Sequence, residues 1–235
     1  MNKYFMRIIL SVTLCFCFFQ EIQAQTINLN ESFIQQNLRT AQLLGKFDPS
    51  FSFTSLPIHT GKKGIKIDSS LIGSKEYGST LKTFFGKYGT LKILPVDFKM
   101  EYSSHHPYSR NNGSMIPNRG YQQLVSFGFF AELGPLSIQF KPESVYAENR
   151  NFEGFPDSHY ATIWARRYLM WNNLDLPERF GEKAYKKSLF GQSSIRLNYH
   201  GLSLGLSSEN IWWGPSVRNS IMMSNQAQGF NHITF

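Results

Sequence analysis

The sequence predicts an all-β protein, an antiparallel β-barrel of the outer membrane with a short helical segment near the N-terminus. Three observations predict it: an N-terminal export signal, segments in which apolar and polar residues alternate, and the alternation of very short turns with long connections between these segments. Because lipid-facing and interior-facing residues alternate along a membrane strand, such a protein needs no long apolar run.

The first 24 residues have the pattern of a signal peptide. Lys3 and Arg7 make a basic start, residues 8–19 are apolar, and a polar stretch ends at Ala24. The apolar run is shorter than the ~20 residues that a membrane-spanning helix needs. We therefore expect export and cleavage near Ala24. Both cysteines lie inside this run, so the mature chain is expected to use no disulfide.

The pattern after the signal divides into two parts. Residues 25–58 are predicted to be a periplasmic segment with a helix over 30–45, capped by Asn30 and Gly45, and a strand over 50–58. Residues 59–235 are predicted to be the barrel domain, although 59–90 lack periodicity and no element is assigned there. The apolar face of the helix comprises Phe33, Ile34, Leu38, Ala41 and Leu44.

The strands of the barrel domain are predicted from alternation with period two. Residues 96–102 and 121–133 alternate, and a turn at Gly134-Pro135 joins the second segment to 136–140. A second hairpin comprises 195–199 and 202–206 around Gly201. One face of these segments is apolar, and the other carries charged, amide and hydroxyl side chains.

The connections differ between the two ends of this sheet. The turns at 134–135 and 200–201 are very short, whereas the loops 104–122 and 147–192 are long. Outer-membrane barrels have short periplasmic turns and long extracellular loops. Because successive connections alternate between the two ends of the sheet, residues 210–220 are predicted to lie at the end with the long loops. Within the second loop, residues 161–171 are predicted to form a helix with Trp164, Tyr168 and Trp171 along one side.

Charge and motifs limit the chemistry. The net charge of +8 suits anionic lipid headgroups, lipopolysaccharide or acidic glycans, and export argues against nucleic acid. We expect no metal, because His105 and His106 beside Glu101 lack the spacing of a ligand set. We expect no cofactor and no catalysis, because no phosphate-binding loop and no G-x-S-x-G elbow occur. Four carboxylates could serve glycoside hydrolysis, but nothing selects a pair: Glu143, Glu148, Glu153 and Asp157.

One block resembles a known family. Residues 209–225, with Trp212-Trp213-Gly214-Pro215 at their centre, resemble the signature of the Wzi-type capsule assembly family, and residues 113–122, 176–181 and 191–198 resemble its version in Bacteroidetes. The resemblance extends from about residue 32 to the end. It implies a non-enzymatic barrel of roughly 18 strands with a periplasmic helical part. It also implies lectin-like attachment of capsular polysaccharide or exopolysaccharide. Family members continue beyond the motif, so Phe235 is expected to end an N-terminal half.

The same block supplies the predicted sugar site. Trp212 and Trp213 offer flat indole faces for a sugar ring, and Arg218, Asn219 and Asn225 offer hydrogen-bond donors and acceptors. The alternative is that both indoles pack in the barrel wall. Secondary candidates are Arg119, Arg166 and Arg167. A porin-like channel is the alternative function, and an outer-membrane hydrolase is disfavoured by the missing nucleophile motif.

Overall fold

The computed structural model describes residues 26–27, 32–47, 49, 51–59, 79–84, 89–170, 179–199 and 202–235. The predicted signal peptide, Asn30, Trp171 and Gly201 lie outside these residues. Within them the protein is mostly antiparallel β-sheet with two short helices, which confirms the all-β prediction. Neither of these helices is long and apolar enough to cross a membrane.

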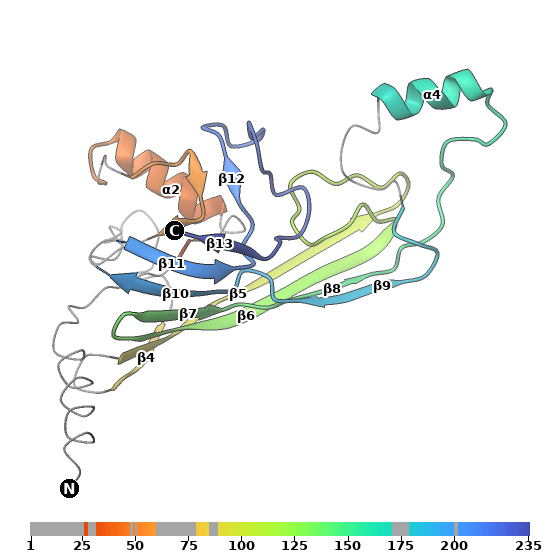
Figure 1. The fold of residues 1–235 in the computed structure, drawn as a ribbon. Helices are drawn as coiled ribbons and strands as arrows, with labels where there is room; N and C mark the ends of the chain where they lie inside the picture. The colour runs from red at the N-terminus through yellow and green to blue at the C-terminus, as the bar shows by residue number, and fades with distance from the viewer. Residues whose placement is uncertain are drawn as a thin grey trace, which may run out of the picture.

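Nine strands form the main sheet (Figure 1). Its path runs β13-β11-β10-β7-β6-β5-β4, and β8 and β9 extend it beside β6; within the described residues the sheet is open. The strands are β4 (Ser79–Phe84), β5 (Gly89–Ser103), β6 (Gly120–Leu133), β7 (Leu136–Phe140), β8 (Glu143–Ala147), β9 (Tyr185–Leu189), β10 (Ser194–Tyr199), β11 (Leu202–Ser207) and β13 (His232–Thr234).

The long strand β6 is the spine of this sheet. It pairs with β5 on one side, and on the other side with β7 near its end and β8 near its start. The pairs Phe129–Phe140 and Ser126–Glu143 share one register, so β7 and β8 continue a single line past Lys141. Gly128 lies opposite this break, and a Cβ there would come within 2.0 Å of the carbonyl oxygen of Phe140.

Strands β9 and β10 form the next line with one extra residue. Glu143 pairs with Leu189, and Gln139 pairs with Ser194. Ser194 is five residues from Leu189, whereas Glu143 is only four residues from Gln139, so the β9–β10 side has one residue more. Such an insertion is a β-bulge, which bends the strand. The amide of Gln192 within it donates to the carbonyl of Lys141 at 3.0 Å.

Most predicted elements are present. The predicted helices correspond to α2 (Ser32–Leu43) and α4 (Ala161–Met170), and the predicted alternating segments lie in β5, β6, β7, β10 and β11. Gly45 and Gly134 have the positive φ angles, 68° and 57°, that their cap and turn positions require. The sequence analysis did not predict the main-sheet strands β4, β8, β9 and β13. β4 falls in the span left without an element, and β9, Tyr-Lys-Lys-Ser-Leu, does not alternate.

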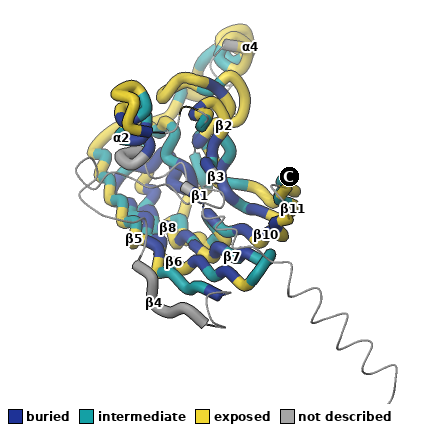
Figure 2. The backbone as a smooth tube through the Cα atoms, turned by 90° about the vertical axis from the view of Figure 1, so that its left-hand side faces the viewer, coloured by how far each residue is buried: buried dark blue, intermediate teal, exposed yellow. Residues whose placement is uncertain are grey.

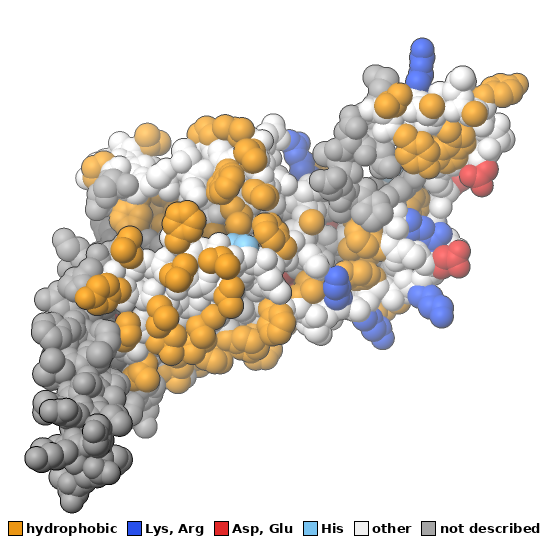
Figure 3. Space-filling model, viewed as in Figure 1, with side chains coloured by type: hydrophobic (Ala, Val, Ile, Leu, Met, Phe, Trp, Pro, Cys, Tyr) orange, Lys and Arg blue, Asp and Glu red, His pale blue; other side chains and the backbone are white. Residues whose placement is uncertain are grey.

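The two faces of the sheet differ in burial, and buried and exposed residues alternate along its strands (Figure 2). On the face called here the outer face, large apolar side chains are exposed, and Figure 3 shows apolar side chains gathered over the sheet around β10 and β11. They include Ile93, Val96, Phe98, Met100, Phe127, Phe129, Leu133, Phe140, Ile195, Leu197, Leu202, Leu204, Leu206 and Ile233. The opposite, inner face buries the apolar residues Leu124, Phe130 and Val145 together with many polar side chains, among them Gln122, Ser126, Glu132, Gln139, Lys141, Glu143, Ser194, Arg196, Asn198 and Ser207.

Short elements cover part of the inner face. β1 (Thr26–Ile27) pairs with β3 (Ile58–His59), and β2 (Ser55–Leu56) pairs with β12 (Trp212–Trp213). Thr26 bonds to Gln139 of the inner face and to Glu209. The predicted N-terminal segment and the C-terminal tryptophan block therefore share one apolar core, which comprises Leu38, Ala41, Phe47, Phe53, Leu56, Ile58 and Trp212.

Candidate functional site

The candidate site lies on two loops that are bound to each other, residues 104–119 and 214–231, called here the paired loops. The amide of Gly113 donates to Asn225 O at 2.8 Å, and Asn225 Nδ2 donates to Asn111 O at 3.1 Å. Gln226 Nε2 donates to Ser109 O at 3.2 Å. These bonds join segments more than 100 residues apart in sequence, so both loops present one surface.

The two indoles of the block have different environments. Trp212 is 4% exposed and packs in the shared core, and its Nε1 donates to Gly214 O and Ser216 O at 3.2 and 3.1 Å. Trp213 is 44% exposed. It lines a cavity of about 510 Å³ whose wall also includes Pro57, Arg196 and His232. Of the two indoles, that of Trp213 is therefore the one exposed enough to contact a sugar, and the predicted sugar contact is restricted to it.

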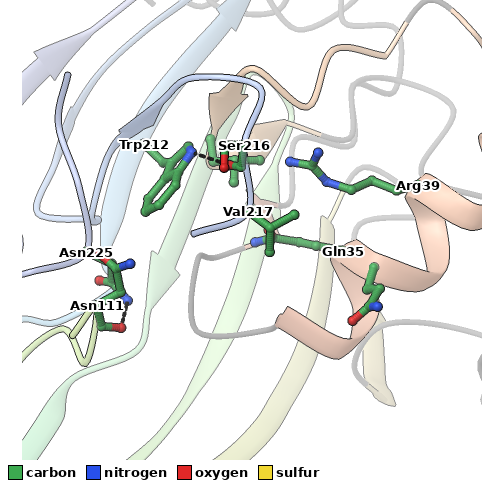
Figure 4. A pocket seen from close by; sticks show the side chains of 9 residues that line it. Gln35, Arg39, Asn111, Trp212, Ser216, Val217 and Asn225 are labelled. Carbon is green, nitrogen blue, oxygen red and sulfur yellow. Dashed lines mark hydrogen bonds between the residues drawn. The ribbon is translucent and has the colours of Figure 1, made fainter. Parts of the chain in front are cut away.

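A smaller cavity of about 140 Å³ separates α2 from the tryptophan block (Figure 4). Gln35 and Arg39 of α2 lie on one side of it, with Trp212 and Asn225 on the other. Arg39 donates to Pro215 O at 3.1 Å and to Phe53 O at 3.0 Å, and burial lowers its pKa from the ordinary value. Arg39 therefore ties the helix to the start of the second loop.

The remaining predicted residues of the block lie on the paired loops. Asn225 is buried, and its bonds hold the two loops together. Arg218 and Asn219 are exposed. Asn111 Nδ2 donates to Arg218 O at 2.8 Å, and Arg110 donates to Asn219 Oδ1. The structure therefore brings Arg218 and Asn219 to the surface beside Arg110, a residue that sequence reasoning missed.

The secondary candidates lie elsewhere. Arg119 bonds to Ser104 O and Asn151 O, so it closes the base of the first loop. Arg166 is exposed on α4. Arg167 lies over the ring of Phe155 at 4.4 Å, and Trp164 stacks on Tyr168 at 5.7 Å. These contacts order the outer part of the second long loop, away from the tryptophan block (Figure 1).

A third cavity, which the sequence did not indicate, lies where the first paired loop meets β5 and β6. Its volume is about 430 Å³, in the ~300–1,000 Å³ range of small-molecule sites. Its lining combines an aromatic ring, a cation, a carboxylate and three amides: Tyr108, Arg110, Glu101, Asn112, Asn118 and Gln122. Such side chains bind hydroxyl-rich ligands. They are common in the sequence, and they form a candidate site only because the fold brings them together.

Glu148 fixes the base of this loop. The amide of Tyr121 donates to its Oε2 at 2.7 Å, and Arg150 forms an ion pair with it at 2.9 Å. The backbone hydrogen bond, followed by the bond from Arg150, lowers the pKa of Glu148. Gly120 precedes Tyr121 with φ 98°, and a Cβ there would come within 2.3 Å of Glu148 Oε2.

The buried charges of the inner face form a structural network. Arg196 pairs with Glu209 at 2.9 Å, and Lys141 pairs with Asp97 at 2.8 Å. Gln192 Nε2 donates to Glu143 Oε1 at 2.9 Å. Every one of these carboxylates thus has a partner. The described residues contain no group of three side chains suited to hold a metal ion, and His105 and His106 are exposed beside each other.

Comparison with known proteins adds no relative. No family model, no curated protein and no solved structure matches the chain.

Proposed function

We propose that this protein is an outer-membrane protein whose sheet forms part of a lipid-embedded barrel and whose paired loops hold capsular polysaccharide or exopolysaccharide. The observation that carries the proposal is the inverted polarity of the sheet. A water-soluble sheet buries its apolar face, whereas here the apolar face is exposed and the inner face buries ionised and amide side chains. Lipid is the solvent that suits this arrangement.

The size of the apolar face supports a bilayer. On β6 the outward residues are apolar from Val125 to Leu133, which spans roughly 27 Å along the strand at ~3.4 Å per residue, or about 21 Å of height at the ~40° tilt of barrel strands. The apolar band of outer-membrane barrels is about 25 Å tall. Beyond the band, toward the paired loops, the outward positions include Tyr102, Tyr121 and Tyr146, and Lys186 lies 5.5 Å from the ring of Tyr146. Tyrosine and lysine suit the headgroup level and the phosphates of lipopolysaccharide.

The polysaccharide part of the proposal rests on the resemblance of residues 209–225 to the capsule assembly family and on the composition of the paired loops. These loops present exposed Arg110, Arg218 and Asn219, and Trp213 lies at the start of the second loop. Indole, guanidinium and amide groups together bind the faces and hydroxyl groups of sugars.

The inner face disfavours a channel. Thr26, Met115 and Glu209 are buried against it, and the ion pair of Arg196 and Glu209 lies beside β10 and β11. Glu209 is fully buried, with bonds from Gln139, Arg196 and Ser207. A conducting pore needs water along this face. We therefore do not propose the porin-like alternative.

The test deletes the gene in its native host and restores it on a plasmid. The protein is expected in the outer-membrane fraction, resistant to carbonate extraction. Deletion is expected to move surface polysaccharide from the cells to the culture medium without reducing its total amount, and the plasmid is expected to reverse this. A mature protein found soluble in the periplasm contradicts the membrane part. Unchanged cell-bound polysaccharide in the deletion strain contradicts the attachment part.

A further inference from the structure

We propose that the cavity between the first paired loop and the loop ends of β5 and β6 is a subsite for one acidic sugar residue. The sugar carboxylate binds Arg110, and a sugar hydroxyl donates to Gln122 at the floor. This inference rests on the proposed function and adds a location and a sugar class to it.

The floor of the cavity holds a buried acceptor that lacks a donor. Gln122 is 2% exposed, and its Nε2 donates to Glu101 Oε2 at 2.9 Å and to Ile116 O at 3.0 Å. Both partners are acceptors, so they fix which side of the amide carries the nitrogen. Its Oε1 accepts no hydrogen bond from the described residues. Burial of an acceptor without a donor is unfavourable, and a sugar hydroxyl supplies that donor.

The walls suit a sugar ring. Tyr108 is 72% exposed and lines the cavity, and an aromatic ring can cover the apolar C–H face of a sugar. Glu101 is held in place by Asn112, whose Nδ2 donates to Glu101 Oε1 at 2.9 Å. Asn118 is fixed by its bond to Gly120 O at 3.0 Å. The polar walls are therefore set before any ligand binds, which reduces the entropy lost on binding.

The rim selects for negative charge. Arg110 is joined to Asn219, and Arg218 is joined through its carbonyl to Asn111, so the paired loops hold two exposed arginines on one surface. Neither forms an ion pair with a described carboxylate. The carboxylate in the cavity, Glu101, is engaged by two amide groups. A uronic acid supplies a carboxylate that pairs with a guanidinium, and it also supplies hydroxyl groups that can donate to Gln122 Oε1.

The experiment uses the whole protein purified in detergent and two probes, oligogalacturonate and its methyl ester, which keeps the hydroxyl groups and removes the charge. The parent protein is expected to bind the acid more tightly than the ester. Arg110→Ala is expected to weaken acid binding about five- to tenfold and to leave ester binding unchanged. Tyr108→Ala is expected to weaken both. Lys183→Ala removes one exposed charge outside the paired loops and is expected to change neither.

Gln122→Met tests the floor while keeping the length of the side chain. It is expected to weaken both probes, and its unfolding midpoint in detergent shows whether it folds. Arg110→Ala and Tyr108→Ala alter exposed residues, so the proposal stays testable if Gln122→Met is unstable. Equal binding of acid and ester by the parent, or of neither probe, overturns the acidic subsite.

Different outcomes test the cavity and the proposed function. If Arg110→Ala and Tyr108→Ala bind the acid as the parent does, while Trp213→Ala binds it less, the cavity is overturned and attachment on the paired loops stands. If the deletion strain retains its polysaccharide, the proposed function falls whatever the purified protein binds.

Discussion

At the residue scale, the adjacent indoles of the tryptophan block show how an extended backbone separates two identical side chains. Successive residues of a strand point to opposite faces, and β12 places Trp212 in the shared core and Trp213 at its surface. The sequence pattern alone left both roles open for both residues. Pairing of β12 with β2 determines which indole is buried, and that pairing joins segments about 156 residues apart.

Trp212→Ala and Trp213→Ala are therefore expected to fail in different ways. Removal of the buried indole is expected to cost about 3–5 kcal/mol of unfolding free energy and to lower surface abundance. Removal of the exposed indole is expected to leave stability nearly unchanged and to weaken polysaccharide binding about two- to twelvefold, from a stacking contribution of ~0.5–1.5 kcal/mol. Urea unfolding in detergent and glycan binding at matched abundance measure the two effects. Equal destabilisation by both variants would contradict the separation.

The carboxylate of Glu148 gives a pH dependence at the same scale. Its folded pKa is lowered, first by the Tyr121 backbone bond and then by Arg150, so its stabilising contribution is complete above the unfolded pKa of about 4.3. That contribution is lost as the pH falls through the lower, folded pKa. The parent is thus expected to be more stable than Glu148→Gln at about pH 6, with the difference shrinking toward about pH 3. A pH-independent difference in urea midpoints would contradict this.

At the element scale, β6 organises the sheet because it pairs with β5 on one side and with both β7 and β8 on the other. Its alternation over 121–133 was sufficient to predict it, as was that of β10 and β11. β4 and β9 could not be predicted from alternation, because β9 carries three consecutive polar residues and gains its strand geometry from pairing with β8. Tertiary pairing therefore supplied what local pattern lacked.

The candidate cavity also depends partly on local sequence pattern and partly on tertiary pairing. The Trp-Trp-Gly-Pro block is visible in the sequence, but Arg110 lies outside the recognised segments, and nothing in the sequence joins Gln122 and Asn219 to it. Arg110 and Asn219 are 109 positions apart and meet only because the two loops bind each other. The sequence could therefore predict Arg218 and Asn219 as exposed donors, and could not predict the cavity that lies beside them.

Gly128→Ala tests the continuity of the β7–β8 line. The added Cβ would approach the backbone of Phe140 and Lys141, which cannot yield as a side-chain tip could. We expect a loss of folding yield. For protein that folds, we expect a lower urea midpoint that corresponds to a loss of ~1–3 kcal/mol of unfolding free energy, as is typical of core overpacking. Ala131→Val, on the outer face of the same strand, is the matched control and is expected to be tolerated. An unchanged midpoint for Gly128→Ala would refute the close approach.

At the scale of the whole molecule, polarity is inverted across the sheet. Fourteen large apolar side chains named above are exposed on one face, while charged pairs such as Arg196–Glu209 are buried against the other. In water, this arrangement would expose the surface that normally drives folding and bury the groups that are most costly to desolvate. This distribution is the basis for our proposal that the outer face meets an apolar solvent.

Two substitutions on one strand test this. Phe127 and Gln123 both face outward on β6, four residues apart, with Phe127 inside the apolar band at 66% exposure and Gln123 beyond it toward the paired loops. In lipid vesicles, Phe127→Arg is expected to cost about 2–4 kcal/mol of unfolding free energy and Gln123→Arg about 0–1 kcal/mol, because the penalty for a charge depends on its depth. Both variants add the same side chain on the same face, so their difference isolates depth from the general effects of arginine. Urea unfolding in vesicles measures both free energies. Were the outer face in contact with water, Phe127→Arg would be neutral or would improve solubility, and the difference between the two variants would vanish.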